Sequence, residues 1–249
     1  MHAFLRDTVS LKVWFLSIAE NIAQVRERIR VAAVRAGRDA NSVTLMAVSK
    51  TFPPEPIREA YGAGVRVFGE NRVQEFAGKA DALRDLADAR WHMIGHLQSN
   101  KAGKAAELFD AVDAVDSLKL AEKLDEAARA SGRMLRVLVE INVGGEAAKT
   151  GMGNDSAELD RLIGEMPRLQ HLELRGLMTV PPFTEDPQGA RPYFRRLRKL
   201  RDQVAGRNLP GVAMDELSMG MSHDFEVAIE EGSTCVRVGS AIFGERARP

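Results

Sequence analysis

The stretch VTLMAVSK, residues 43–50, decides the fold. It is too apolar for an edge strand, it ends at Lys50, and the sequence TFPP, residues 51–54, interrupts regular structure directly after it. A buried strand with a charged residue at its carboxyl end is typical of a parallel α/β barrel, which keeps its functional groups at that end. Partial loss of water there lowers the pKa of an amine, and a neutral amine can condense with an aldehyde. Lys50 is therefore the first candidate site residue.

A second stretch, TCVRVGSAIFG at residues 234–244, complements the first. It is an apolar strand that runs into the small-residue turn Gly239-Ser240, a pattern that suits phosphate capture at a helix N-terminus. Side chains of a strand alternate between its faces, so Lys50 shares a face with Thr44, Met46 and Val48, and Arg237 shares one with Cys235 and Gly239. If both faces point into a barrel, Lys50 and Arg237 lie together at its top. An amine and an anion site suggest a phosphorylated aldehyde as ligand.

Strand-like and helix-like runs alternate along the whole chain, which indicates βα units and a parallel sheet. The predicted strands are residues 43–49, 65–68, 91–94, 111–115, 135–143, 172–178, 216–219 and 234–238. We expect residues 16–249 to form one closed (β/α)8 barrel and residues 1–15 to be a loosely attached N-terminal extension. The alternative is an open doubly wound sheet, which would not make the first and last strands neighbours.

Apolar stripes at helical spacing predict the helices between these strands. The first helix carries Ile22, Val25, Ile29, Ala32, Ala33 and Ala36 on one stripe and ends at Gly37. Further helices are predicted at residues 54–62 and 72–86, and another follows the turn at residues 95–100 and ends near residue 109. Two more begin at capping residues, one at Asp116-Ser117 and one at Asp155 with Glu158. A last long helix has an inward stripe of Phe194, Leu197, Leu200 and Val204.

Composition narrows the function classes. The 249 residues suit a single barrel, and 45% apolar with 28% charged residues is typical of a soluble globular protein. Lys+Arg and Asp+Glu both number 35, so no net field favours nucleic acid or anionic lipid. No run approaches the roughly 20 apolar residues of a membrane span. The single cysteine, Cys235, excludes an internal disulfide and favours a reducing, cytoplasmic setting, where it would be a small buried apolar residue.

Two turns near the end of the chain favour a phosphate site. The segment SMGMS, residues 218–222, follows the predicted seventh strand, and Gly239-Ser240 follows the eighth. Barrels often bind phosphate with the loops after these two strands, through backbone N–H groups and hydroxyls. For either turn alone, an ordinary glycine turn with a capping serine is an equal alternative.

Other polar clusters have simpler explanations. His92 and His96 have i,i+4 spacing, but their segment is predicted as a strand and a turn, so we expect no metal pair. Strand-end and capping roles suffice for Asp110, Asp113 and Asp116. For the basic helix at residues 191–201 we expect a solvated outer face; its basic residues are Arg191, Arg195, Arg196, Arg198, Lys199 and Arg201.

Seven blocks spread over nearly the whole chain resemble the pyridoxal phosphate homeostasis protein family, whose fold is similar to the barrel domain of alanine racemase. The blocks are AVSKT (47–51), FGEN (68–71), WHMIGHLQSNK (91–101), VDSLKLAEKL (115–124), GLMTVPP (176–182), LSMGMSHDFEVAIEEGST (217–234) and VRVGSAIFG (236–244). The resemblance implies a PLP fold type III barrel without the C-terminal β domain of the racemase. It also implies pyridoxal 5'-phosphate (PLP) as the cofactor.

The resemblance further implies the role of each site residue. Lys50 matches the lysine that holds PLP as an internal Schiff base, and Arg237 matches the arginine that faces the pyridine nitrogen. The phosphate positions are matched by Ser218, Gly239 and Ser240, and positions that line the ring by Asn71 and Met219. Two departures from the family pattern are Arg72 after the GEN motif and Lys149-Thr150-Gly151 in place of Lys-Ser-Gly.

Two functions remain open at this point, a carrier that holds and hands over PLP and a PLP-dependent amino-acid racemase. Racemisation wants a second proton carrier opposite the lysine, and only two tyrosines, Tyr61 and Tyr193, are available. An arginine against the pyridine nitrogen also weakens the electron sink of the ring. We therefore expect a non-enzymatic PLP carrier involved in vitamin B6 homeostasis, with apo PLP-dependent enzymes as partners. The resemblance is to a barrel without the second domain of the racemase, which provides part of that enzyme's dimer contact, so we also expect a monomer.

Overall fold

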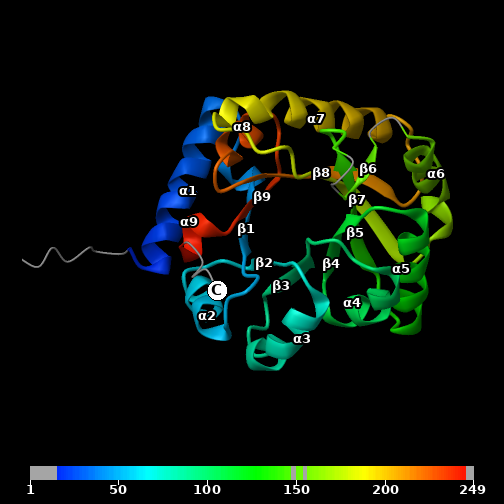
Figure 1. Ribbon diagram of the computed structural model, residues 1–249, viewed down its shortest axis with the longest axis horizontal. Helices are drawn as coiled ribbons and strands as arrows, with labels where there is room; N and C mark the ends of the chain where they lie inside the picture. The colour runs from blue at the N-terminus through cyan, green and yellow to red at the C-terminus, as the bar shows by residue number, and fades with distance from the viewer. Residues whose placement is uncertain (1–15, 147–149, 154–155, 245–249) are drawn as a thin grey trace, which may run out of the picture.

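The computed structural model describes residues 16–146, 150–153 and 156–244 (Figure 1). Within them, eight parallel strands form a closed barrel in the order β1-β2-β3-β4-β5-β7-β8-β9, with β9 paired to β1 and β4 to β5. The strands are β1 Thr44–Val48, β2 Val67–Glu70, β3 Arg90–Met93, β4 Ala111–Val115, β5 Leu135–Asn142, β7 Leu172–Met178, β8 Val212–Met221 and β9 Cys235–Val238. A two-residue strand, β6 Met152–Gly153, pairs with β5 outside the ring. The predicted barrel is confirmed, and the open-sheet alternative is wrong because the β4–β5 pairing closes the ring.

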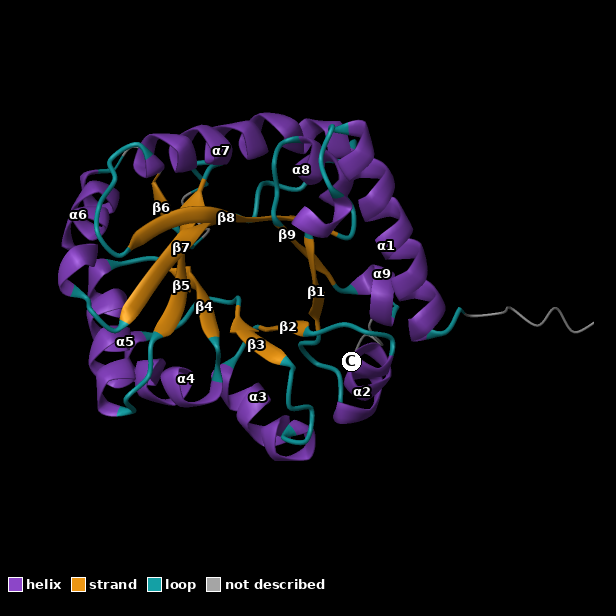
Figure 2. Cartoon of the chain, turned by 180° about the vertical axis from the view of Figure 1, so that it is seen from behind, coloured by secondary structure: helices purple, strands orange, loops and turns teal. Residues whose placement is uncertain are grey.

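Helices surround this barrel on its outside (Figure 2). They are α1 Ile18–Arg35, α2 Pro54–Gly62, α3 Val73–Ala80, α4 Ala102–Leu108, α5 Leu118–Ala130, α6 Ala157–Glu165, α7 Arg191–Ala205, α8 Phe225–Glu230 and α9 Ser240–Phe243. The helix after the last strand, α9, has only four residues. The long N-terminal helix α1 packs against α2, α8 and α9 and so covers the barrel at the junction of β1 and β9. The expected extension at residues 1–15 lies outside the described residues.

The sequence explains both ends of α1. Ser17 caps its N-terminus, because the Ser17 hydroxyl accepts from the Glu20 N–H while the Glu20 carboxylate accepts from the Ser17 N–H at 2.8 Å. Gly37, with φ of 67°, follows the C-terminus in the left-handed conformation that glycine adopts without strain. The predicted stripe faces inward as expected; its buried members are Ile22, Val25, Ile29, Ala32 and Ala33.

Several predicted boundaries differ from the structure. The second strand was expected at residues 65–68 and spans Val67–Glu70, and the seventh was expected at 216–219 and extends over Val212–Met221. The helix expected at 72–86 ends at Ala80 and continues only as a 3-10 turn, Asp81–Leu83. The cap of α6 is Ser156, whose hydroxyl accepts from the Leu159 N–H at 3.1 Å. Asp155, which was expected to cap this helix, lies outside the described residues.

The apolar core has two layers. A large cluster fills the space between the barrel and its helices, and a small cluster of Ala114, Leu138 and Met178 lies apart from it, on β4, β5 and β7. Cys235 is also buried, and burial raises the pKa of its thiol to about 12. The thiol is therefore protonated at neutral pH, as expected for a small packing residue.

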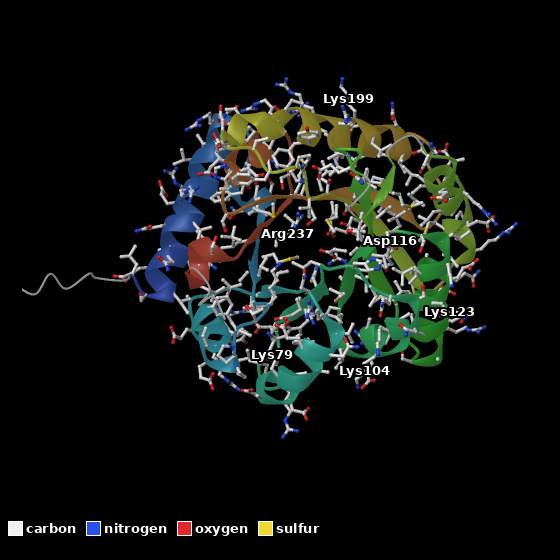
Figure 3. The ribbon with its side chains drawn as sticks, viewed as in Figure 1. Lys79, Lys104, Asp116, Lys123, Lys199 and Arg237 are labelled. Carbon is white, nitrogen blue, oxygen red and sulfur yellow. The ribbon has the colours of Figure 1, made fainter. Side chains whose placement is uncertain are left out.

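The basic helix α7 has the expected solvated outer face, since Arg195, Arg196 and Lys199 are exposed, but several of its arginines also form ion pairs. Glu231, whose side chain is only 4% exposed, lies beside α7 and binds Arg191 at 2.6 Å and Arg195 at 3.1 Å. Arg198 approaches the same carboxylate at 3.5 Å. Lys199 is exposed at the outer edge of the molecule, as predicted (Figure 3). The arginines of α7 thus attach this helix to the segment that follows α8.

Replacing Glu231 by glutamine is expected to lower the free energy of unfolding by about 1.5–3 kcal/mol at pH 7, the usual range for hydrogen bonds to charged groups. Burial raises the Glu231 pKa, but hydrogen bonds from Arg191 and Arg195 outweigh it, and the net pKa is lowered. A lowered carboxylate pKa stabilises the fold above the unfolded-state pKa of about 4.3, and this stabilisation is lost as the pH falls through the folded-state pKa. The difference from wild type should therefore shrink in urea unfolding at acidic pH.

The matched control for this experiment is Glu226→Gln. Glu226 pairs with Arg28 at 2.6 Å, but both side chains are well exposed, at 30% and 44%. An exposed pair of this kind contributes about 0–1 kcal/mol. Equal losses from the two variants would contradict a special role for Glu231.

Among the described residues, no helix combines the length and the apolar character needed to cross a membrane.

Candidate cofactor site

A cavity of about 430 Å³ lies where the carboxyl ends of β1 and β9 meet those of their neighbours. We call it the cofactor cavity. Residues from the ends of six strands contribute to it, so it lies where parallel barrels carry their functional sites. Its lining residues are Val48, Lys50, Phe52, Asn71, Ile94, Val180, Met221, Ser222, His223, Arg237, Gly239, Ser240 and Gly244.

Strand alternation brings Lys50 and Arg237 to the same cavity. β1 and β9 are paired in parallel with Met46 opposite Arg237, so Lys50 lies four residues farther along its strand direction. Val48 and Gly239, each two residues from one of these side chains, line the cavity as well. The shared face predicted from the sequence is therefore present in the structure, with Lys50 partly buried and Arg237 only 4% exposed.

A buried ammonium group holds the turn that carries Lys50. The Lys79 Nζ atom of α3 donates to the Ser49 carbonyl at 3.0 Å and to the Phe52 carbonyl at 3.2 Å, on either side of Lys50. Thr51 has φ of 69°, which is unusual for a residue other than glycine, and its N–H donates to the Glu75 carboxylate. Two side chains of α3 thus fix the backbone on both sides of the site lysine.

Glu70, at the end of β2, completes this network. It is fully buried, its Oε1 atom lies 2.9 Å from Lys79 Nζ, and the same oxygen accepts from the Ser49 hydroxyl at 2.5 Å. Burial raises the Glu70 pKa, and the Lys79 charge opposes that rise. The result is a buried ion pair directly behind the Lys50 turn, which we call the Glu70–Lys79 pair.

Arg237 is a buried cation that lines the cavity. Its Nη1 donates to the Ser218 hydroxyl at 2.8 Å and its Nη2 to the Thr179 carbonyl at 2.7 Å. Burial lowers the pKa of Arg237. A guanidinium carries five N–H donors and no acceptor, so Arg237 can still donate to a ligand atom that accepts hydrogen bonds.

The turns after β8 and β9 meet on the other side of the cavity. The Ser222 hydroxyl accepts from the N–H groups of Gly239 and Ala241, at 3.3 and 3.4 Å. Gly220, with φ of 95°, makes this turn possible, because a Cβ atom there would lie 2.9 Å from the Phe225 backbone. Backbone N–H groups and hydroxyls therefore converge where the sequence predicts a phosphate.

The sequence-predicted site residues separate into two groups. Five of them line the cofactor cavity, namely Lys50, Asn71, Arg237, Gly239 and Ser240. Ser218 and Met219 do not, because β8 continues to Met221 and holds both within the strand. Ser218 is hydrogen-bonded to Arg237, and Met219 packs in the outer core.

Sequence reasoning did not single out Ser222, Thr179 or Lys79. Ser222 belongs to the turn at residues 218–222 that the sequence identified. Had the seventh strand been predicted to extend to Met221, Ser222 would have been the first residue after it. The Thr179 contact uses a backbone carbonyl, and Lys79 reaches the site from α3. No local pattern marks either of them.

The histidines of the WHMIGH block form two separate pairs. His92 is buried and lies 3.1 Å from the Asp113 carboxylate, which raises its pKa although burial opposes the rise. His96 lies 2.9 Å from Asp116. Asp110 accepts from the Trp91 N–H at 2.8 Å, a strand-end role as expected. In the described part of the chain, no three His, Cys, Asp or Glu side chains are grouped so that they could hold a metal ion.

Comparisons with known proteins agree with this geometry. A family model described as "Alanine racemase, N-terminal domain" matches residues 17–247. The chain is 46% identical to the pyridoxal phosphate homeostasis protein of Aquifex aeolicus (strain VF5), over 93% of this chain and 99% of that protein. It is 47% identical to the Pseudomonas aeruginosa protein of the same name, over 92% and 96% of the two chains.

Solved structures give the same assignment. PipY of Synechococcus elongatus PCC7942, solved with PLP bound, is 39% identical, with a TM-score of 0.80 over 92% of this chain and 100% of PipY. Alanine racemase of Clostridium difficile 630 is only 17% identical, with a TM-score of 0.66 over 92% of this chain and 58% of the racemase, and it supports the fold alone. The chain therefore belongs to the pyridoxal phosphate homeostasis protein family, whose barrel is similar to the N-terminal domain of alanine racemase.

Proposed function

We propose that this protein binds PLP, holds it covalently on Lys50, and takes part in vitamin B6 homeostasis as a carrier. The observation that carries the proposal is the presence of Lys50 and Arg237 in one cavity beside the Gly239-Ser240 turn. The names of its close relatives and the PLP bound to PipY support the same ligand. A reducing cytoplasm, a monomeric state and apo PLP-dependent enzymes as recipients belong to this proposal.

The cavity offers a suitable group for each part of PLP. Lys50 would provide the amine for the aldehyde, and Asn71, which lines the same cavity, would contact the ring. Arg237 is a pure donor, which suits an unprotonated pyridine nitrogen. A phosphate oxygen could replace the Ser222 hydroxyl as the acceptor for the N–H groups at residues 239 and 241, and the hydroxyls of Ser222 and Ser240 could then donate to the phosphate. In this proposal Ser218 acts by orienting Arg237, and Met219 supports the strand from the outer core.

The same residues favour storage over catalysis. Bound PLP supplies a reversible covalent link to an amine and an electron-withdrawing ring. Arg237 leaves the ring nitrogen without a proton source, which weakens electron withdrawal. Neither Tyr61 nor Tyr193 lines the cavity, so a racemase-type second proton carrier from these residues is missing there. The racemase alternative predicts steady exchange of the α-proton of an amino acid in deuterium oxide, and a carrier predicts none.

The proposed function is tested by titrating the purified protein with PLP and following absorption in the near-visible range. We expect saturation at one PLP per chain, retention of the bound PLP through gel filtration, and reactivation of an apo PLP-dependent enzyme after mixing. A protein that stays colourless and retains no PLP would refute binding. Retention of PLP without any reactivation would refute the carrier role.

The Ser240→Ala variant is expected to bind PLP more weakly by about 1.5–3 kcal/mol, because it loses a hydrogen bond to a charged phosphate. Its affinity for pyridoxal, which has no phosphate, should be unchanged. Equilibrium titration of both vitamers against wild type and variant measures this difference. Equal weakening for both ligands would show that Ser240 acts on something other than the phosphate.

A further inference from the structure

A second cavity of about 350 Å³ adjoins the cofactor cavity at the same end of the barrel. The two cavities share Asn71, Ile94 and Val180. The second one continues along the ends of β3 and β5 to Glu140 and His96, which do not line the first. Its volume lies at the lower end of the roughly 300–1,000 Å³ that is usual for small-molecule sites.

Glu140 gives this second cavity its chemical character. The residue is 6% exposed, and its Oε1 atom accepts from the Thr150 hydroxyl at 2.9 Å. Its Oε2 atom is buried and has no hydrogen-bond partner among the described residues. An unsatisfied buried acceptor destabilises the fold, and more so when it is charged. Because Glu140 lines the cavity, a rotation of its carboxylate would present this buried oxygen to a donor from a ligand.

The surrounding charges favour a cation as that donor. Asp116, whose side chain is only 16% exposed, acts electrostatically on Glu140, so a second carboxylate lies near the cavity without lining it. His96 pairs with Asp116 at 2.9 Å. Burial raises the Glu140 pKa and the Asp116 charge adds to that rise, whereas Arg237 and His96 lower it. A ligand cation next to Oε2 would stabilise the charged carboxylate.

We propose that this second cavity is a binding site for the primary ammonium group of a small amine, with free amino acids as the fitting class. An ammonium group is compact and carries three donors. One donor satisfies Glu140 Oε2, and the cavity joins the cofactor cavity through Asn71, so the remainder of the amine extends toward Lys50. We call it the amine cavity. The significance of an amine beside Lys50 rests on the proposed PLP-binding function, but binding itself depends only on the cavity.

The test therefore uses the full-length protein without PLP. Ethylammonium, L-alanine and propionate are titrated separately, and binding is followed by protein-observed NMR. Ethylammonium has the ammonium group alone, propionate has the carboxylate alone, and L-alanine has both. The variants are Glu140→Gln, which keeps the shape and removes the charge, and Glu173→Gln on β7, whose glutamate does not line the amine cavity. Thermal unfolding verifies that each variant is folded.

We expect ethylammonium and L-alanine to bind wild type and Glu173→Gln, with at least tenfold weaker binding to Glu140→Gln, and propionate not to bind at the cavity. Absence of ammonium binding to wild type would overturn the proposal, as would unchanged binding to Glu140→Gln. A separate PLP titration of the same samples keeps the two hypotheses apart. Amine binding without PLP binding would refute the proposed function alone. PLP binding without amine binding would refute only the amine cavity.

Discussion

The Lys50→Ala variant is expected to form no covalent adduct with PLP after borohydride reduction, whereas wild type should give close to one adduct per chain. The reason is geometric, since Lys50 is the lysine among the residues that line the cofactor cavity. Mass spectrometry of the intact protein and of its peptides measures both the amount and the position of the adduct. In the variant, PLP should still bind reversibly, because Arg237 and the 239–241 turn remain.

Two further variants sharpen this experiment. Lys50→Arg keeps the positive charge but provides no amine that condenses with the aldehyde, so it should behave like Lys50→Ala. Lys104→Ala removes an exposed lysine of α4 that does not line the cavity, and its adduct should remain at the wild-type level (Figure 3). A full adduct in Lys50→Ala, mapped to another lysine, would refute the assignment of the covalent link.

Strand periodicity made the top of the barrel predictable from sequence. A side-chain period of two sets which residues of β1 and β9 share a face, and barrel closure makes these two strands neighbours. These two facts together place Lys50 and Arg237 in one cavity without any knowledge of side-chain contacts. The location of Ser218 was harder to predict, because it depends on where β8 ends. The strand continues to Met221 through a register shift against β9.

Buried charges explain the remaining differences between the predicted and the observed structure. The predicted second strand ended before Gly69 and Glu70, whereas the observed strand includes this fully buried glutamate. In the fold, Lys79 of α3 neutralises that glutamate, so the strand continues to Glu70. The ion pairs of the α7 arginines were not predicted either, since nothing near them in sequence points to the buried Glu231. Contacts between distant segments decide both cases, and local patterns do not contain them.

The Lys79→Met variant is expected to lose about 3–5 kcal/mol of stability, because it leaves the buried Glu70 carboxylate without its partner. Burial raises the Glu70 pKa and the Lys79 charge opposes that rise, so without Lys79 the carboxylate takes up a proton more readily. A buried acid with a raised pKa destabilises the fold most where it would be charged. The loss in urea unfolding should therefore be larger at pH 8 than at pH 5.

A double variant separates stability from positioning of Lys50. Glu70→Gln combined with Lys79→Met removes both charges, so most of the lost stability should return. The carbonyls of Ser49 and Phe52 still lack the donor that holds the Lys50 turn, so covalent attachment of PLP should stay slower than in wild type by at least tenfold. Lys123→Met, which removes an exposed ion pair with Glu126, is the control and should change neither quantity appreciably. Wild-type attachment rates in a restored double variant would mean that the Glu70–Lys79 pair stabilises the barrel without positioning its lysine.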